Sequence, residues 1–219
     1  MPSADRPAAP PLTRADWALI LVLMAVQFTH MVDFVIIMPL GKRMMDELDL
    51  TDDAFGLVVA AYAWAAALAS LAASAVMDRF DRRTVLLTMY AGFAASTLYC
   101  GLADDFSHLL LARVLAGVFG GVAAVAVMAV IGDVFPPGKR GRASGAVMWA
   151  FGVASVGGLP AGLELAGWFG RGAPFVALAG LSLAVWVVGW VRLPAVRGHL
   201  AAERASKWAE FVAVAREPN

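Results

Sequence analysis

Hydrophobic and polar positions follow one another along this chain in long blocks, not in the short periods of a soluble helix or strand. Six blocks are dominated by apolar residues, and each is about 20 residues long, the length that an α-helix needs to cross a bilayer core about 30 Å thick. The predicted spans are 17–38, 55–77, 84–102, 109–131, 143–163 and 174–191. The pattern therefore predicts an all-α integral membrane protein with six transmembrane helices.

The fifth predicted span is the least regular of the six. Glycine and proline inside a membrane helix free backbone groups that only neighbouring helices can satisfy, because lipid offers no hydrogen-bond partner. Four such residues, Gly157, Gly158, Pro160 and Gly162, predict a bend in this span, and Glu164 is expected to close it.

The remaining residues form two tails and several loops. Residues 1–14 hold four prolines among small residues and are expected to be a disordered cytoplasmic tail. Residues 15–193 form the predicted bundle, and 194–219 are expected to form an amphipathic cytoplasmic tail with Trp208 at the membrane interface. The loop 41–53 carries five acidic residues, which we interpret as a solvated outer rim.

Composition excludes an ordinary soluble domain, and the charge distribution predicts an orientation. Hydrophobic residues make up 61% of the chain and charged residues 16%, against about 45–50% and 25% in a typical globular protein. The net charge of zero gives no reason to expect a nucleic-acid partner.

Of the 17 Lys and Arg residues, 13 lie in the tails and after the second and fourth spans, and 3 follow the odd-numbered spans. The positive-inside rule then places both termini in the cytoplasm.

Two ionisable residues lie well inside predicted spans, Asp33 in the first and Arg113 in the fourth. A charge near the bilayer centre costs at least ~2.5 kcal/mol, so residues of this kind mark functional sites. With the termini in the cytoplasm, the first span runs outward and the fourth runs inward. At 1.5 Å per residue both charges then lie roughly 10 Å below the outer surface. We therefore expect Asp33 and Arg113 to meet.

This pair is the candidate proton-coupling element. A carboxylate beside an arginine stays ionised, whereas the same carboxylate in a dry cavity without the arginine takes up a proton. A conformational change that makes and breaks the contact would therefore bind and release protons. His30 precedes Asp33 by three residues on the same helix face and is expected to line the same cavity. The alternative is that Arg113 extends to the outer headgroups and Asp33 faces a water-filled vestibule without titrating.

Three stretches of the sequence are similar to motifs of one family. They are Asp-Arg-Phe-Asp-Arg-Arg at 78–83, Arg-Val-Leu-Ala-Gly at 113–117, and Asp-Val-Phe-Pro-Pro-Gly-Lys-Arg-Gly-Arg-Ala at 133–143. Together with the helix count, they make the chain resemble the N-terminal half of a major facilitator superfamily transporter, close to the bacterial drug and sugar efflux branch of proton antiporters. The resemblance implies half of a twelve-helix bundle, built as two inverted three-helix repeats. It also implies proton-coupled efflux of a small organic solute across a bacterial plasma (inner) membrane.

The resemblance further implies a cytoplasmic gate. In the family, the aspartate matching Asp78 faces the N-terminus of the eleventh helix, which stabilises a carboxylate. The arginines matching Arg82 and Arg83 interact with acidic groups near the end of the fourth helix, here Asp133. Breaking these contacts lets the two halves rock apart. The gate residues of this chain are Asp78, Arg82, Arg83, Asp133, Arg140 and Arg142.

The chain departs from the family pattern at several positions. Ser74 and Asp81 stand where the loop motif usually has glycine, and Ala116 stands where the fourth-helix motif often has glutamine. In the fifth span, a Gly-Pro pair followed by two glycines is replaced by Gly-Gly-Leu-Pro-Ala-Gly at 157–162.

Six helices correspond to half of the transporter, and the tail from residue 192 is similar to the connector between the two halves. Three explanations remain open: a truncated gene product, two six-helix chains around a shared axis, or association with a separately encoded second half. The expected partners are the lipid bilayer, protons, a small-molecule substrate, and a second half or a second copy. The alternative function is a membrane structural or regulatory subunit that does not transport.

The sequence does not specify the substrate. Aromatic and polar residues of the spans are candidates for lining a cavity: Trp17, Gln27, His30, Asp33, Tyr62, Trp64 and Trp149. No enzyme activity, cofactor or metal is expected, because the three histidines are far apart in the sequence and His199 lies outside the spans. The single cysteine, Cys100, predicts no disulfide.

Overall fold

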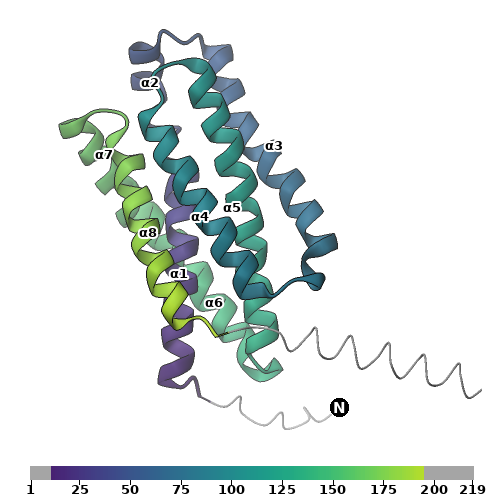
Figure 1. Ribbon diagram of the computed structural model, residues 1–219. Helices are drawn as coiled ribbons and strands as arrows, with labels where there is room; N and C mark the ends of the chain where they lie inside the picture. The colour runs from purple at the N-terminus through teal and green to yellow at the C-terminus, as the bar shows by residue number, and fades with distance from the viewer. Residues whose placement is uncertain (1–10, 195–219) are drawn as a thin grey trace, which may run out of the picture.

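The computed structural model describes residues 11–194, apart from the side chain of Asp78. All regular structure in this range is helical, and the long helices run side by side (Figure 1). The helices are α1 (Arg14–Ile36), α2 (Gly41–Leu48), α3 (Asp52–Val76), α4 (Arg82–Leu102), α5 (Phe106–Val134), α6 (Pro137–Val153), α7 (Leu159–Phe169) and α8 (Ala173–Arg192). The predicted tails 1–14 and 194–219 lie largely outside the described residues.

The six predicted spans are confirmed. Within the described part of the chain, six helical stretches are long and apolar enough to cross a membrane, and α6 and α7 together make the fifth. The helices of the first four spans begin earlier than the apolar blocks because polar residues cap their first turns. The Thr13 hydroxyl accepts a hydrogen bond from the Asp16 backbone N–H at 3.2 Å, and the Asp105 carboxylate accepts one from the His108 backbone N–H at 2.8 Å.

One segment predicted as a loop contains a helix. Residues 41–53 include α2, which buries Gly41 and Met44 against the bundle and turns its acidic residues outward. The helix ends at Asp49, whose φ of 52° is left-handed, and the N–H of this residue returns to the Met45 carbonyl. The acidic rim therefore consists of the outer side of α2, its C-cap residue Asp49 and the first turn of α3.

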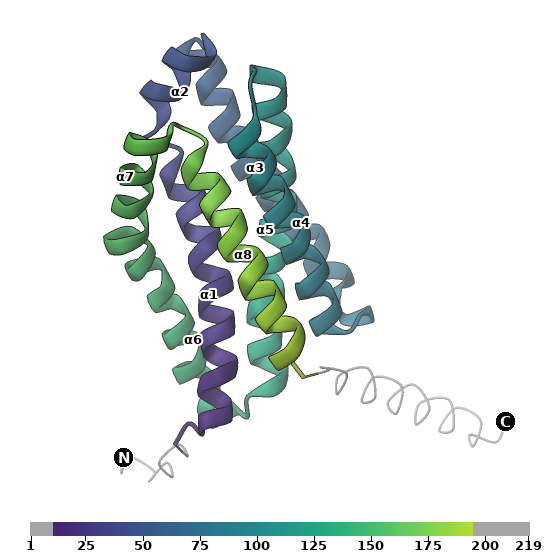
Figure 2. The ribbon, with the colours of Figure 1, turned by 60° about the vertical axis from the view of Figure 1, so that its left-hand side comes forward.

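The packing has the internal symmetry that two inverted three-helix repeats require. Helix α3 packs along α5 as α6 packs along α1, and α4 packs on α5 as α8 packs on α1. Helices α4 and α8, which occupy equivalent places in the two repeats, pack on each other. Figure 2 shows α1 lying between α6 and α8. The predicted fold class is confirmed.

Small residues allow α3 and α5 to approach closely. A Cβ atom at Gly121 of α5 would lie 2.6 Å from the Ala66 carbonyl oxygen of α3, and one at Gly117 would meet the Tyr62 carbonyl oxygen. Such close backbone approach is how membrane helices associate without a hydrophobic driving force between them.

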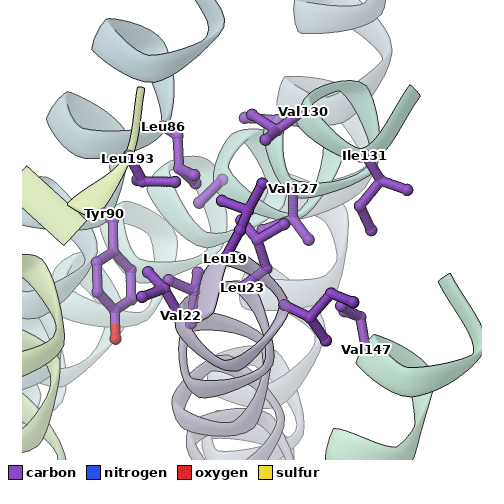
Figure 3. Close-up of a cluster of buried hydrophobic side chains, with 14 of the residues drawn as sticks. Leu19, Val22, Leu23, Leu86, Tyr90, Val127, Val130, Ile131, Val147 and Leu193 are labelled. Atoms are coloured by element: carbon purple, nitrogen blue, oxygen red, sulfur yellow. The ribbon is translucent and has the colours of Figure 1, made fainter. Parts of the chain in front are cut away.

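Two apolar clusters lie at opposite ends of the bundle, with polar side chains between them. The larger cluster fills the terminal end, where α1 begins and α8 ends, and includes Leu23, Leu86 and Val127 (Figure 3). The smaller cluster lies at the α2 end and includes Ile36 and Phe175. Along α1, α4 and α5, the residues between these clusters include buried polar side chains, and they form the candidate site.

Candidate functional site

The centre of the site is an ion pair between α1 and α5. Arg113 Nη1 lies 3.0 Å from Asp33 Oδ2, and it also points at the Asp33 backbone carbonyl at 3.4 Å. The two side chains are 1% and 0% exposed. Low exposure strengthens the attraction but also makes each charge depend on the other, because a lone buried charge is very costly.

Two further side chains complete this pair. The Thr97 hydroxyl of α4 donates a hydrogen bond to Asp33 Oδ1 at 3.3 Å, and the ring of Tyr62 from α3 lies 4.1 Å from the Arg113 guanidinium carbon. Four helices therefore converge on one charge pair. The sequence identified Tyr62 only as a cavity candidate and did not identify Thr97, because neither residue carries a charge that marks it within its span.

His30 lies at the edge of this cluster. Its ring centroid is 6.3 Å from that of Tyr62 and 5.7 Å from that of Phe93, and it packs over Gly120, where a Cβ would approach within 2.6 Å. Neither ring nitrogen has a hydrogen-bond partner among the described residues, and the Tyr62 hydroxyl and Arg113 Nε also lack one. The site therefore holds several buried polar atoms with unused hydrogen-bonding capacity.

The structure contradicts the alternative in which the two charges lie apart. Arg113 does not extend to the surface, and Asp33 faces no open vestibule in this conformation. The other cavity candidates separate into two groups. Gln27 is buried, whereas Trp17, Trp64 and Trp149 are exposed on the outside of the six-helix unit.

The predicted gate residues cluster at the terminal end, but they do not all make the expected contacts. Arg82 Nε lies 3.0 Å from Asp133 Oδ2 and so links α4 to the last turn of α5. Arg83 does not pair with Asp133; its Nη2 donates to the Trp190 carbonyl at 2.5 Å, and its guanidinium lies 5.5 Å from the Trp190 ring centroid. Successive residues of a helix point in directions about 100° apart, and in this fold only Arg82 points toward Asp133.

The other gate residues differ in their surroundings. Arg140 Nε donates to the Phe135 carbonyl at 2.8 Å and so satisfies a backbone group at the end of α5. Arg142 is exposed in the first turns of α6. The backbone of Asp78 lies in a single 3₁₀ turn between α3 and α4, Met77–Arg79, and its side chain is outside the described part of the structure.

The fifth span is interrupted where its glycines are concentrated. A π-helical segment, Ala154–Gly158, separates α6 from α7 just before Pro160. Gly158 and Gly162 lie against Val32 and Ile36 of α1, whereas Gly157 faces open space. The prediction that Glu164 closes the helix is wrong, because α7 continues to Phe169 and ends at Gly170, which has a φ of 94°. A single acidic residue costs a helix little, whereas glycine readily adopts a positive φ.

The α2 end carries an ion network that the sequence did not reveal. Glu47 binds Arg43 within α2 at 2.7 Å and Arg171, from the α7–α8 loop, at 3.0 Å. Arg171 Nη1 also donates to the Ala103 carbonyl at 2.7 Å, and Arg43 donates to the Ala166 carbonyl. This network ties α2 to the ends of α4 and α7.

An acidic cluster with a histidine lies at the start of α5. The candidate ligand atoms of Asp104, Asp105 and His108 lie within 4.8 Å of one another, and all three residues are exposed. His108 Nδ1 lies 2.7 Å from Asp104 Oδ1, and this hydrogen bond holds the pKa of Asp104 below its usual value. We assign the cluster to capping of α5.

The comparisons with known proteins agree with this architecture. The family model described as Major Facilitator Superfamily matches residues 23–218. The chain belongs to the Major Facilitator Superfamily. It is accordingly a multi-pass membrane protein, and the relatives of this superfamily are transporters.

Curated superfamily members include resistance and export proteins. An uncharacterized MFS-type transporter of Bacillus subtilis (strain 168), YceJ, is 31% identical over 79% of this chain and 44% of its own length. The puromycin resistance protein pur8 of Streptomyces alboniger is 34% identical over 72% of this chain and 30% of its own. The tetracenomycin C resistance and export protein of Streptomyces glaucescens is 32% identical over 67% of this chain and 26% of its own length. The chain thus spans less than half of each of these relatives.

Solved structures of the Major Facilitator Superfamily share the fold. A bacterial homologue of the human lysosomal transporter Spinster, inward-facing and occupied, aligns with a TM-score of 0.72 at 20% identity, over 84% of this chain and 45% of that chain. The inward-open xylose transporter XylE from E. coli aligns with a TM-score of 0.72 at 14% identity, over 86% of this chain and 50% of that chain. The six-helix bundle therefore matches about half of each transporter.

Proposed function

We propose that this six-helix unit forms half of a proton-coupled exporter of small organic solutes in the bacterial inner membrane. The observation that carries the proposal is the ion pair between Asp33 and Arg113, which is buried inside the membrane-spanning bundle. The names of relatives support the direction of transport, because two of them are a resistance protein and an export protein.

The proton cycle follows from the electrostatics of the pair. While Arg113 contacts Asp33, the carboxylate is stabilised as an ion and binds no proton. If a conformational change draws Arg113 away, the carboxylate is left in a poorly solvated site, where the neutral acid is favoured. Asp33 would then take a proton from one side of the membrane and release it to the other when the pair reforms. His30, beside Tyr62 in the same cluster, is the proposed route to Asp33.

The proposed orientation places the terminal end in the cytoplasm, with both chain ends on that side. The excess of Lys and Arg at that end supports it. The gate would then comprise the link between Arg82 and Asp133 on the cytoplasmic side, together with Arg140 and Arg142. Asp78 would be the gate residue that faces the other half of the transporter.

A second six-helix unit is part of this proposal, because the relatives and the similar structures are at least about twice as long as the matched region. That unit would be a second half or a second copy of this chain. The solute would bind between the two units and meet the exposed aromatic residues of α3 and α6, such as Trp64 and Trp149.

The test is solute movement driven by a pH gradient in vesicles that contain the protein, alone or together with a second six-helix unit. Puromycin, named in one relative, serves as the first probe. We expect uptake by the wild-type protein, no coupled uptake by Asp33→Asn, and unchanged uptake by Asp46→Asn, which alters an exposed carboxylate of α2. The double variant Asp33→Asn/Arg113→Gln, which leaves no unpaired charge, should also be uncoupled.

Two results would count against the proposal. Undiminished gradient-driven uptake by inserted Asp33→Asn would overturn the coupling role of this residue. Uptake of no solute from a broad panel, either by this chain alone or with any second six-helix unit, would favour a structural or regulatory subunit.

A further inference from the structure

A groove of about 310 Å³ runs between α4 and α8 near the terminal end of the bundle. Its floor is apolar and includes Leu87 and Ala91, and its walls carry Trp186 and Trp190. Thr84 and Thr88 lie along α4 with exposed side chains, one turn apart, and belong to the same lining. Figure 1 shows α4 and α8 side by side on the outside of the bundle.

A positive charge without an anionic partner closes this groove at its terminal end. Arg83 is half-buried, and its guanidinium donates to the Trp190 backbone carbonyl and lies over the Trp190 ring. Arg83 Nε has no hydrogen-bond partner, and no carboxylate forms an ion pair with Arg83 among the residues that the structure describes. A partly exposed guanidinium with unused donors at the end of an apolar groove can bind an anion.

The aromatic wall is fixed in place. Trp186 Nε1 donates to the Leu87 carbonyl at 2.9 Å, and the rings of Trp186 and Trp190 lie 5.5 Å apart. Tryptophan is enriched at membrane–water interfaces, where its ring contacts the acyl chains and its N–H contacts polar groups. The groove therefore spans the boundary between the headgroups and the hydrocarbon, with its arginine at the headgroup level.

We propose that this groove binds an anionic phospholipid. One acyl chain lies along the apolar floor between α4 and α8, and the headgroup phosphate accepts hydrogen bonds from the Arg83 guanidinium and from the Thr84 hydroxyl. Basic pockets between transmembrane helices on the cytoplasmic side favour acidic headgroups, because that leaflet carries anionic lipids. Arginine also suits phosphate, since its planar donors match the phosphate oxygens. A free phosphate ion would leave the apolar floor unfilled.

The lipid site does not depend on the proposed transport activity, so its test measures the phospholipid bound to the protein and not the transport of a solute. The full-length chain is purified from membranes that contain equal amounts of phosphatidylglycerol and phosphatidylcholine, and retained lipid is counted by native mass spectrometry. We expect the wild-type protein to retain phosphatidylglycerol preferentially. Arg83→Gln should reduce this retention about tenfold, as expected for loss of a hydrogen bond to a charged group. Arg14→Gln, which removes an exposed arginine at the same end of the bundle, should retain the lipid.

A second variant tests the groove without changing the charge. Ala91→Phe fills the floor and should reduce retention as strongly as Arg83→Gln, so the proposal stays testable if one variant fails to fold. Inorganic phosphate at millimolar concentration should not displace the lipid. Equal retention of phosphatidylglycerol by the wild-type protein and by either folded groove variant would overturn the site, and so would displacement by inorganic phosphate.

Discussion

The ring of Tyr62 lies against the guanidinium group of Arg113, with the arginine Cζ 4.1 Å from the ring centroid. The contact joins α3 to α5 at the level where Asp33 of α1 pairs with the same arginine. The Tyr62 hydroxyl, by contrast, has no hydrogen-bond partner among the described residues. The ring, not the hydroxyl, is therefore the part of Tyr62 that stabilises the charge.

Replacement of Tyr62 should separate the two parts of this side chain. Tyr62→Phe keeps the ring and loses no hydrogen bond to a described residue, so it should change the free energy of unfolding by less than ~0.5 kcal/mol. Tyr62→Leu removes the ring and should lower it by ~2 kcal/mol or more, because a desolvated cation–π contact is worth about that amount. Chemical unfolding in detergent micelles measures both. A loss in Tyr62→Phe equal to that in Tyr62→Leu would show that the hydroxyl is the important group.

The ion pair should behave as a coupled unit in a double-mutant cycle. Asp33→Asn leaves Arg113 buried without its counter-charge, and Arg113→Gln leaves Asp33 buried without its own. Each single change should lower the free energy of unfolding by about 3–5 kcal/mol. The double variant should be more stable than the sum of the two losses predicts, by at least ~1 kcal/mol. Additive losses in the same unfolding assay would mean that the pair contributes no coupling.

Two glycines of α5 provide a matched test of helix packing. Gly121→Ala places a methyl group 2.6 Å from the Ala66 carbonyl oxygen and 2.9 Å from Ala66 Cα, so α3 must move away. The expected loss of stability is about 1–3 kcal/mol. Gly132→Ala meets nothing within 4 Å and should be neutral or stabilising by up to ~1 kcal/mol. Thermal unfolding of the two variants side by side checks the difference, and equal midpoints would contradict it.

The adjacent glycines of the π-helical segment should also differ. Gly158→Ala brings a methyl group against Val32 and within 3.0 Å of the Phe28 ring, whereas Gly157→Ala meets nothing within 4 Å. Val32 is buried and β-branched, so it cannot easily rotate away. We expect Gly158→Ala to lose about 1–3 kcal/mol and to loosen the contact between α1 and α6. Cysteine cross-linking between these helices measures the loosening, with Gly157→Ala as the reference, and equal efficiencies would refute it.

The number of helices could be predicted from the length of the apolar blocks, and the central ion pair from the depth of its two residues in the membrane. Each span is an apolar block of fixed minimum length, and Asp33 and Arg113 were matched by counting residues from the ends of two antiparallel spans. Thr97 and Tyr62 required knowledge of which face of a helix points inward. That information is weak in a membrane, where the lipid-facing side of a helix is as apolar as its buried side.

Contacts between segments far apart in the sequence could not be predicted either. Arg83 was expected to reach Asp133 by resemblance, but in this fold its rotational position on α4 directs it to Trp190 of α8. The loop 41–53 looked like a solvated acidic segment because its charges are prominent in the sequence. Its helical part, α2, forms an ion pair through Glu47 with Arg171, more than one hundred residues away, and no local pattern predicts such a contact.

The dependence of α3 on a single neighbour has a consequence for biosynthesis. Helix α3 docks chiefly on α5, which follows it in the chain, whereas α6 docks on α1, which is already in the membrane when α6 is made. During translation, α3 must therefore wait in the bilayer with its alanine-rich surface uncovered until α4 and α5 have left the ribosome. The first three spans cannot reach their final arrangement alone. Their packing requires α5, whose glycines allow α3 to approach closely.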